Sequence, residues 1–257
     1  MKQGINGLRG RGPGLFVLVD PERTSPAEAA ALARAAEQDG ALGMLIGTSF
    51  DGAHRTGEVA TAIKQSCSLP LLLFPGSAGQ LVPQVDAVLL LSLVSGRNAQ
   101  YLIEEHVRSV PFFLRHQVQS VSTAYILVDG GRVTAVEAVS QTRPLPADKP
   151  EIAAAHAMAG RMIGMSAVYL DAGSGAQEPV RPEVIRAVRE KVDLPLFVGG
   201  GIRTPSQVSA ARDAGADFVV VGNCIEDGGP GAIRAFAEAA SPPSPSSPPS
   251  PPSPVFH

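Results

Sequence analysis

Three glycine-rich stretches in the second half of the chain have the composition of a phosphate site. Each follows a run of aliphatic residues, and the three stretches are Tyr169–Gly175, Gly199–Ile202 and Val221–Asn223. Glycine lets backbone N–H groups approach an anion closely, and Ser174 adds a hydroxyl donor. Turn formation would explain one such stretch alone. Three of them after consecutive aliphatic runs predict a phosphate-binding site.

Two carboxylates are placed in the same way, at the ends of aliphatic runs. Asp20 ends the first run, and Thr48 and Ser49 end the second with hydroxyl groups. A carboxylate beside a hydroxyl is an oxygen ligand set for Mg²⁺ if substrate phosphates complete the octahedron. Alternatively, Asp20 supports the N-terminal end of the helix that starts at Pro26. Asp171 is a candidate general base, or else an acceptor for N–H groups of its glycine turn.

Eight aliphatic runs separated by alanine-rich helical segments have to position these residues. The runs are continuously apolar, as expected for parallel strands that are covered on both faces. Eight strand–helix alternations are typical of a (β/α)8 TIM barrel, whose active site lies at the C-terminal ends of the strands, although a doubly wound sheet has the same local pattern. The predicted strands are Leu15–Asp20, Ala41–Thr48, Leu69–Pro75, Ala87–Val94, Thr123–Asp129, Val168–Gly173, Leu194–Gly201 and Phe218–Asn223.

The connection Gly76–Asp86 differs from the other crossovers. Helices with clear start signals are predicted elsewhere, at Pro26–Gln38 with Ser25 as N-cap, and at Pro182–Lys191. A crossover with its helix needs at least about 10–12 residues, and this one also contains two glycines and a proline. We therefore predict a shortened or missing third helix. Its place is taken either by one or two helical turns or by a groove for a long apolar substrate, near Leu72, Leu73, Leu89 and Leu91.

The two ends of the chain are expected to lie outside the barrel domain, residues 15–240. Met1–Gly14 is expected to be a loose lead-in, and Ser241–His257 is a Ser/Pro-rich tail expected to be disordered. A net charge of −3 argues against nucleic acid as a partner. Cys67 and Cys224, the two cysteines, fit a reducing cytoplasm. The N-terminus has no apolar segment typical of a signal peptide.

Seven motifs, in the order of the chain, relate these residues to a known family. They are Leu18–Pro21, Ile46–Thr48, Leu72–Ser77, Ser95–Asn98, Tyr169–Ala176, Val198–Ile202 and Val221–Asn223. In these motifs the chain resembles the geranylgeranylglyceryl phosphate synthase family, which includes the bacterial heptaprenylglyceryl phosphate synthases. The resemblance runs from Leu15 to about Asp227. The glycine motifs are shared by many phosphate-binding barrels, so the first and third motifs are the more specific.

The resemblance implies a prenyltransferase that joins a polyprenyl (geranylgeranyl) diphosphate to the C3 hydroxyl of sn-glycerol 1-phosphate and releases diphosphate. It implies Mg²⁺ on Asp20 and Thr48, and an apolar groove for the polyprenyl chain. It implies Asp171 as the base, where the family more often has Glu. The substrate-binding residues that it implies are Tyr169, Leu170, Asp171, Ala172, Gly173, Ser174, Gly175, Gly200, Gly201, Gly222 and Asn223.

Two other functions stay open. One is a different phosphate-binding barrel, a phosphosugar isomerase or aldolase, which would call for a lysine or paired carboxylates at strand ends. The other is a non-catalytic relative whose Ser/Pro tail binds a partner through polyproline recognition. The apolar flank beside Gly76–Asp86 is a candidate surface for a homo-oligomer. A lipid product also implies peripheral contact with a membrane.

Overall fold

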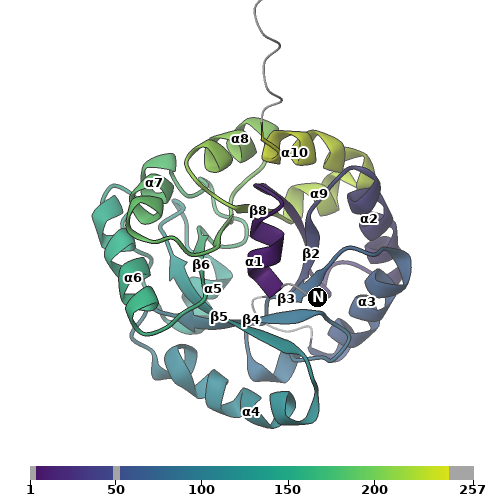
Figure 1. The fold of residues 1–257 in the computed structure, drawn as a ribbon, viewed down its shortest axis with the longest axis horizontal. Coiled ribbons are helices and arrows are strands. Elements are labelled where there is room, and N and C mark those ends of the chain that lie inside the picture. The colour runs from purple at the N-terminus through teal and green to yellow at the C-terminus, as the bar shows by residue number, and fades with distance from the viewer. Residues whose placement is uncertain (1–3, 49–52, 243–257) are drawn as a thin grey trace, which may run out of the picture.

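A computed structural model describes residues 4–48 and 53–242 of the chain. In this part, eight parallel strands close into one barrel in chain order, and β8 pairs with β1. Figure 1 shows the barrel with its helices arranged around it. The predicted (β/α)8 barrel is confirmed, and each predicted aliphatic run overlaps one strand. The strands are β1 (Gly14–Val19), β2 (Gly43–Ile46), β3 (Leu71–Leu73), β4 (Ala87–Leu93), β5 (Gln119–Leu127), β6 (Ala167–Asp171), β7 (Leu196–Gly199) and β8 (Phe218–Val221).

The two helices with clear start signals, Pro26–Gln38 and Pro182–Lys191, have the predicted bounds. Ser25 caps α2: its Oγ accepts the Glu28 N–H at 3.3 Å, and the Glu28 carboxylate accepts the Ser25 N–H at 2.8 Å. The helices are α1 (Gly4–Arg9), α2 (Pro26–Gln38), α3 (Ala53–Ser66), α4 (Glu105–Arg115), α5 (Ala135–Ser140), α6 (Pro150–Met162), α7 (Pro182–Lys191), α8 (Pro205–Asp213), α9 (Asn223–Gly228) and α10 (Ile233–Ala240). Short 3₁₀ or π turns are η1 (Ala78–Gln80), η2 (Gln100–Glu104) and η3 (Pro230–Ala232).

Each strand divides its side chains between two apolar cores, because successive residues point to opposite faces. Val17 and Val198 point outward and are buried against the helices. Phe16, Phe197 and Phe218 point inward, where the Phe197 and Phe218 rings lie 4.6 Å apart and the Phe16 and Phe218 rings 5.3 Å apart. Packed rings therefore fill the barrel interior, and a substrate has to bind at one end of it.

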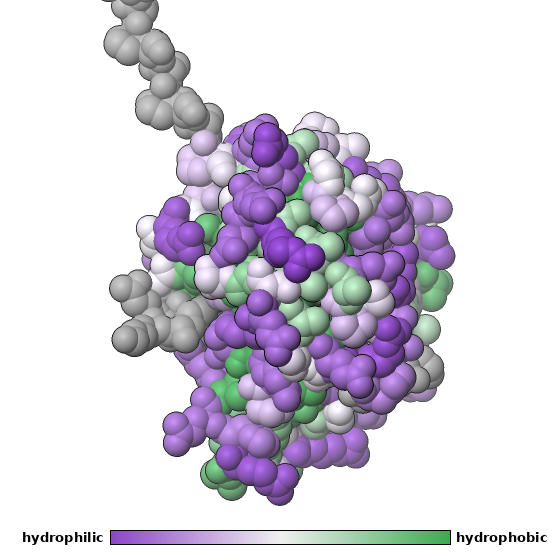
Figure 2. All heavy atoms as spheres, turned by 90° about the vertical axis from the view of Figure 1, so that its right-hand side faces the viewer, coloured by the Kyte–Doolittle hydropathy of each residue, from purple (hydrophilic) through white to green (hydrophobic). Residues whose placement is uncertain are grey.

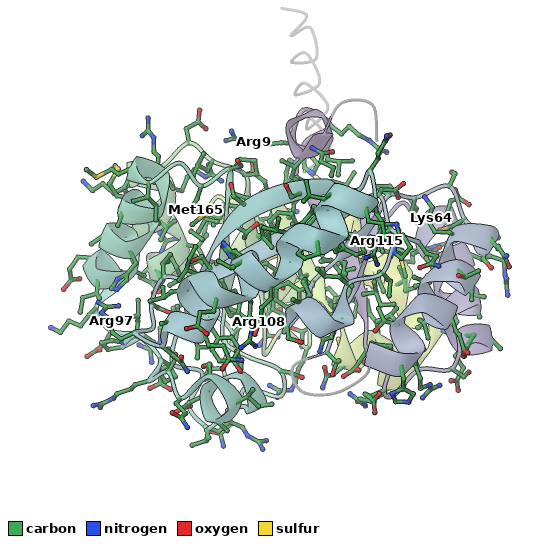
Figure 3. All side chains as sticks on the ribbon, turned by 90° about the horizontal axis from the view of Figure 1, so that it is seen from below. Arg9, Lys64, Arg97, Arg108, Arg115 and Met165 are labelled. Carbon is green, nitrogen blue, oxygen red and sulfur yellow. The ribbon has the colours of Figure 1, made fainter. Side chains whose placement is uncertain are left out.

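The N-terminal segment is not the loose lead-in that the sequence suggested. It forms α1, and Ile5 and Leu8 are buried in the inner core of the barrel. Arg9 forms ion pairs with Asp217 at 3.0 Å and with Asp193 at 2.6 Å, just before β8 and β7. Figure 3 shows α1 lying over one end of the barrel. An open barrel end would expose apolar residues. Ile5 and Leu8, three residues apart on the short helix α1, cover them.

We expect Leu8→Ala to lower the melting temperature. Truncating a buried leucine costs about 2–5 kcal/mol, and in a domain of this size each kcal/mol corresponds to roughly 2–4 °C. Leu8 is 6% exposed. Calorimetry on the variant and on Arg11→Ala, an exposed residue in the next turn, measures the difference. Equal melting temperatures for Leu8→Ala and the wild-type protein would contradict the burial of α1.

The third helix of the barrel, which would follow β3, is missing as predicted. Only the 3₁₀ turn η1 lies between β3 and β4. The turn is fixed by a hydrogen bond from the Ala78 N–H to the Glu105 carboxylate on α4, at 2.7 Å, and the Gln80 side chain accepts the Gly76 N–H at 2.7 Å. Leu90, on the outer face of β4, is consequently only half-buried. The side of the barrel between η1 and α4 is therefore open and apolar.

Most of the surface is polar. On the side formed by α2 and α3, charged and polar residues predominate and small apolar residues show between them (Figure 2). Figure 3 shows α4 across another side, with Arg108 along it and Arg115 at its end. Four aliphatic side chains on η2 and α4 are exposed, namely Ile103, Val107, Val110 and Leu114. Among the described residues, no helix is both long and apolar enough to cross a membrane.

Candidate functional site

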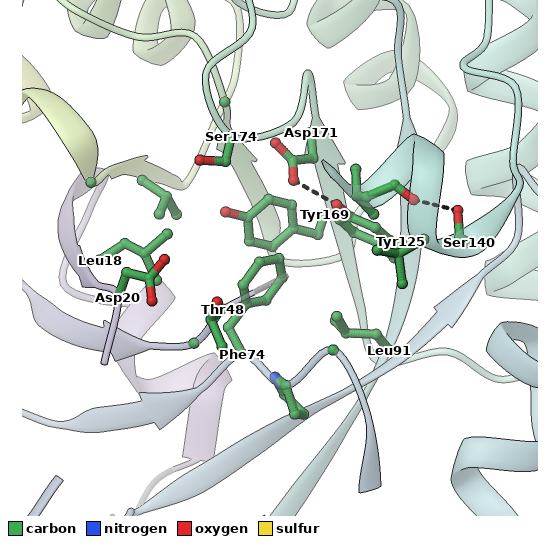
Figure 4. A pocket seen from close by; sticks show the side chains of 18 of the residues that line it. Leu18, Asp20, Thr48, Phe74, Leu91, Tyr125, Ser140, Tyr169, Asp171 and Ser174 are labelled. Atoms are coloured by element: carbon green, nitrogen blue, oxygen red, sulfur yellow. Dashed lines mark hydrogen bonds between the residues drawn. The ribbon is translucent and has the colours of Figure 1, made fainter. Parts of the chain in front are cut away.

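A cavity of about 440 Å³ opens at the C-terminal ends of the strands. Its walls come from the loops after β1, β2, β3, β6, β7 and β8, from the loop after β5 with α5, and from β4, η2 and α4 on one side. This volume is typical of small-molecule sites, which are about 300–1,000 Å³. In Figure 4, Asp171 and Ser174 lie on one side of the cavity, Asp20 and Thr48 lie across from them, and Leu91 lies to the third side.

Asp20 and Thr48 lie in the same wall of the cavity. Both line it, and they follow the paired residues Val19 of β1 and Ile46 of β2. Asp20 Oδ1 accepts the N–H of Glu22 at 2.9 Å. The carboxylate thus stabilises a local turn, whereas the helix that starts at Pro26 is capped by Ser25. Ser49, the other hydroxyl candidate, lies outside the described residues.

Glu226 holds the loop that carries Asp20, a role that sequence reasoning missed. Its buried carboxylate accepts the backbone N–H of Asp20 at 2.9 Å and the Thr24 hydroxyl at 2.6 Å. Arg23 adds an ion pair at 3.6 Å. Glu226 lies on α9, after β8, so it connects the two neighbouring loops that follow β8 and β1. No pattern within the sequence indicates a contact over this separation.

The donor set in this wall suits Mg²⁺ better than a softer metal. Asp20 and Thr48 offer hard oxygen atoms at adjacent strand ends. Within the described part of the chain, no group of three or more His, Cys, Asp or Glu residues is arranged to enclose a metal. The remaining ligands of an ion here would have to be substrate oxygens or water.

Asp171 is buried at the end of β6 and has two hydrogen-bond donors. The Tyr125 hydroxyl donates to Oδ2 at 2.6 Å, and the Gly173 N–H donates to Oδ1 at 2.7 Å. Burial raises the pKa of the Asp171 carboxyl, and these two hydrogen bonds oppose the rise. The same burial, together with Asp171, raises the pKa of Tyr125 well above its usual value. A carboxyl group with a raised pKa at the wall of a cavity is a chemically suitable proton acceptor.

The glycines of the predicted phosphate site form a close backbone junction. Gly200 and Gly201 have positive φ angles of 80° and 70°. A Cβ on Gly200 would lie 2.6 Å from the Gly173 nitrogen, and one on Gly201 would lie 2.6 Å from the Glu178 carbonyl oxygen. Only glycine therefore lets the loops after β6 and β7 meet here. Their backbone, with Ser174 at its edge, lines one end of the cavity.

Eight of the eleven predicted substrate-binding residues line the cavity. They are Tyr169, Asp171, Ser174, Gly175, Gly200, Gly201, Gly222 and Asn223. Leu170 and Ala172 instead belong to the outer core, because they alternate with the inward residues Tyr169 and Asp171. The Gly173 N–H is already bonded to Asp171. Ser174 and Asn223, from different loops, lie within 3.4 Å of each other through their side-chain oxygens.

The apolar part of the cavity occupies the open side left by the missing helix. Six of its residues are Leu81, Leu90, Leu91, Leu93, Tyr101 and His106. Of the leucines that the sequence suggested for a groove, only Leu91 lines the cavity, whereas Leu72, Leu73 and Leu89 are fully buried. His106 also lies at the wall of the cavity, where its Nε2 is 2.8 Å from the Leu91 carbonyl oxygen.

Comparison with known proteins identifies relatives over nearly the whole barrel. Residues 10–240 match the PcrB family. The geranylgeranylglyceryl phosphate synthase of Chitinophaga pinensis is 42% identical over 210 residues, which cover 82% of this chain and 83% of that protein. The geranylgeranylglyceryl phosphate synthase of Korarchaeum cryptofilum is 39% identical over 214 residues, or 83% of this chain and 88% of that protein.

Solved structures agree with this relation. The crystal structure of (S)-3-O-geranylgeranylglyceryl phosphate synthase from Thermoplasma acidophilum, in complex with its substrate sn-glycerol-1-phosphate, superimposes with a TM-score of 0.88. The two chains are 30% identical, and the match covers 94% of this chain and 99% of that one. A thiamine phosphate pyrophosphorylase from Pyrococcus furiosus, at 15% identity and a TM-score of 0.58, shares the fold alone.

Proposed function

The chain belongs to the PcrB family, and from this premise we propose that it is a prenyltransferase of the geranylgeranylglyceryl phosphate synthase type. It joins a polyprenyl diphosphate to sn-glycerol 1-phosphate. The observation that carries the proposal is the composition of one cavity. Glycine backbone lies at one end, the oxygens of Asp20 and Thr48 lie in a wall, and apolar side chains line the side where the third helix is missing.

In this reaction the C3 hydroxyl oxygen of glycerol 1-phosphate attacks C1 of the polyprenyl chain. The new C–O bond forms as the bond from C1 to the diphosphate oxygen breaks, and diphosphate leaves with the bonding electrons. Asp171 takes the hydroxyl proton, a role supported by its burial and its raised pKa. The Tyr125 and Gly173 hydrogen bonds hold the carboxylate in one orientation.

The two phosphorylated substrates would occupy different ends of the cavity. The phosphate of glycerol phosphate would be held by Ser174, Gly175, Gly200, Gly201, Gly222 and Asn223. Mg²⁺, held by Asp20 and Thr48, would neutralise charge on the leaving diphosphate. The polyprenyl chain would lie between η1 and α4, among leucines.

An aldolase that works through a lysine fits this cavity poorly, since no lysine is among the described residues that line it. Three further expectations from the sequence stay predictions: self-association through the open flank, contact with a membrane, and a cytoplasmic location.

The test is to incubate the purified full-length protein with radiolabelled sn-glycerol 1-phosphate, geranylgeranyl diphosphate and Mg²⁺. An organic-soluble labelled product, with release of diphosphate, is the expected result. sn-Glycerol 3-phosphate, the enantiomer, is the matched control. Absence of product with every polyprenyl diphosphate tried, despite binding of glycerol 1-phosphate, would refute the proposed transfer.

We expect affinity for the polyprenyl substrate to rise with chain length and then to level off. Each buried CH₂ contributes about 0.8 kcal/mol, so one isoprene unit should strengthen binding at least tenfold while it still enters the channel. Binding measured from dimethylallyl to heptaprenyl diphosphate gives the profile. Leu90→Trp, in the wall of the channel, should move the plateau to shorter chains without changing glycerol 1-phosphate affinity. A flat profile would exclude the channel as the polyprenyl site.

A further inference from the structure

The loops after β6 and β7, which line the phosphate end of the cavity, are joined by one side chain. Arg203 follows β7, and its Nη2 donates to the Ala176 carbonyl at 2.5 Å. Its Nη1 donates to the Gln177 carbonyl at 2.8 Å and lies 3.4 Å from the Gly201 carbonyl oxygen. Ala176 and Gln177 belong to the loop after β6, and Gly201 belongs to the loop after β7. A single guanidinium thus bonds to backbone on both sides of the junction.

The same stretch of the β6 loop is held from its other side by backbone alone. The Gly130 carbonyl, after β5, accepts the N–H of Gln177 at 2.8 Å and that of Glu178 at 3.0 Å. The N–H of Gln177 therefore donates to the β5 loop, and the carbonyl of Gln177 accepts from Arg203. Residues 172–181 contain no helix or strand in which their backbone groups bond to one another. The position of the loop consequently depends on these contacts with its neighbours.

The charge of Arg203 is also available to the cavity. The hydrogen-bond partners of its guanidinium are neutral carbonyl groups, and within the described chain no carboxylate lies within ion-pair distance of it. Arg9, Arg23 and Arg189, in contrast, are each paired with carboxylates. Arg203 lines the phosphate end of the cavity, whereas Asp20 and Glu226 belong to the other wall.

We propose that Arg203 is a positioning residue for the phosphate site. Its planar fork holds the β6 loop against the β7 loop, so that Ser174, Gly175 and the Gly200–Gly201 backbone keep their places before a ligand arrives. Lysine has the charge but not the fork that reaches two carbonyls at once. The identity of the ligand, sn-glycerol 1-phosphate, rests on the proposed function. The role of Arg203 in arranging the loops does not.

The experiment compares Arg203→Lys, Arg203→Ala and wild-type protein in two kinds of measurement. Calorimetry gives the affinity for sn-glycerol 1-phosphate and for inorganic phosphate. Both variants should bind each ligand at least tenfold more weakly than the wild type, and free guanidinium should restore part of the loss in Arg203→Ala alone. KM for the polyprenyl diphosphate should change less than twofold. Arg186→Ala is the matched control, because Arg186 is exposed on α7 and, among the described residues, pairs only with Glu183.

Hydrogen exchange of the ligand-free protein distinguishes a role of Arg203 in positioning the loop from a simple effect of its charge on the phosphate. The amides of Gln177 and Glu178, bonded to Gly130, should exchange faster in Arg203→Lys, while amides in β7 and β8 should not change. If Arg203→Lys binds phosphate as the wild type does, or exchanges at the wild-type rate at both amides, the proposal is wrong. If the wild-type protein binds inorganic phosphate but not glycerol 1-phosphate, the proposed function is refuted. The hydrogen-exchange data then decide alone whether Arg203 positions the loop.

Discussion

Asp171→Asn is expected to lose turnover by about 10²–10⁴-fold and yet to melt at a higher temperature than the wild-type protein. The loss follows from removing the proton acceptor. The gain follows from burial, which makes the charged carboxylate costly: Asp171 is 7% exposed, and burial raises its pKa. Asparagine has nearly the same shape, and its side chain also bonds to Tyr125 and Gly173 once the hydroxyl rotates.

The direction of the pH dependence follows from the sign of this shift. A raised pKa means that the folded protein binds the proton of Asp171 more tightly than the unfolded chain does. The contribution of this group to stability is therefore greatest below the pKa of a free aspartate, about 3.9, and is lost as the pH rises through the folded-state pKa. The advantage of Asp171→Asn in melting temperature should be largest near neutral pH and should shrink in acid.

Steady-state kinetics measure the loss of turnover, and calorimetric melting at several pH values measures the gain in melting temperature. Tyr125→Phe is the informative companion, because it removes a hydrogen bond that lowers the pKa of Asp171 and leaves the carboxyl in place. Its pH–rate profile should move to higher pH. Full turnover in Asp171→Asn would exclude Asp171 as the base. An unchanged or lower melting temperature at neutral pH would contradict the cost of the buried charge.

Asp20→Asn is expected to abolish turnover while binding of glycerol 1-phosphate survives. The reason is that Asp20 would hold the metal, and the metal would hold the diphosphate and not the phosphate of glycerol phosphate. The neutral amide keeps the turn with Glu22, because its oxygen still accepts that N–H. The fold should therefore be unchanged.

Calorimetry with glycerol 1-phosphate, and Mn²⁺ binding measured with and without inorganic diphosphate, test this prediction. Wild-type protein should bind Mn²⁺ more tightly with diphosphate present, and Asp20→Asn should not. Asp213→Asn removes an exposed carboxylate on α8 and controls for net charge. If Asp20→Asn loses glycerol 1-phosphate binding as severely as turnover, the assignment of Asp20 to the metal is wrong.

The barrel and its glycine loops were predictable because their signals are local. Continuous aliphatic runs indicate strands buried on both faces, and Ser25 or Gly40 indicates a helix boundary within a few residues. The short connection after β3 was visible as a simple count of residues. A carboxylate or glycine at the end of a strand is likewise local, so Asp20 and Gly200 were found.

The contacts that hold these residues were not predictable, because they join loops far apart in the chain. Glu226 bonds to Asp20 over 206 positions, and Tyr125 bonds to Asp171 from the neighbouring strand. The leucines predicted for the apolar channel, apart from Leu91, were misplaced for a different reason. Without a covering helix, the outward residue Leu90 is the one that becomes available, whereas Leu72 and Leu89 stay inside the barrel.

The contacts of helix α1 join parts of the chain that are synthesised far apart in time. Asp193 and Asp217, the partners of Arg9, follow it by 184 and 208 positions. Ile5 and Leu8 have no barrel end to cover until β8 has left the ribosome. Contacts of such separation close slowly, since loop closure costs more entropy as the loop grows. Ile5 and Leu8 therefore reach their buried positions only late in folding, after the other strands of the barrel have been made.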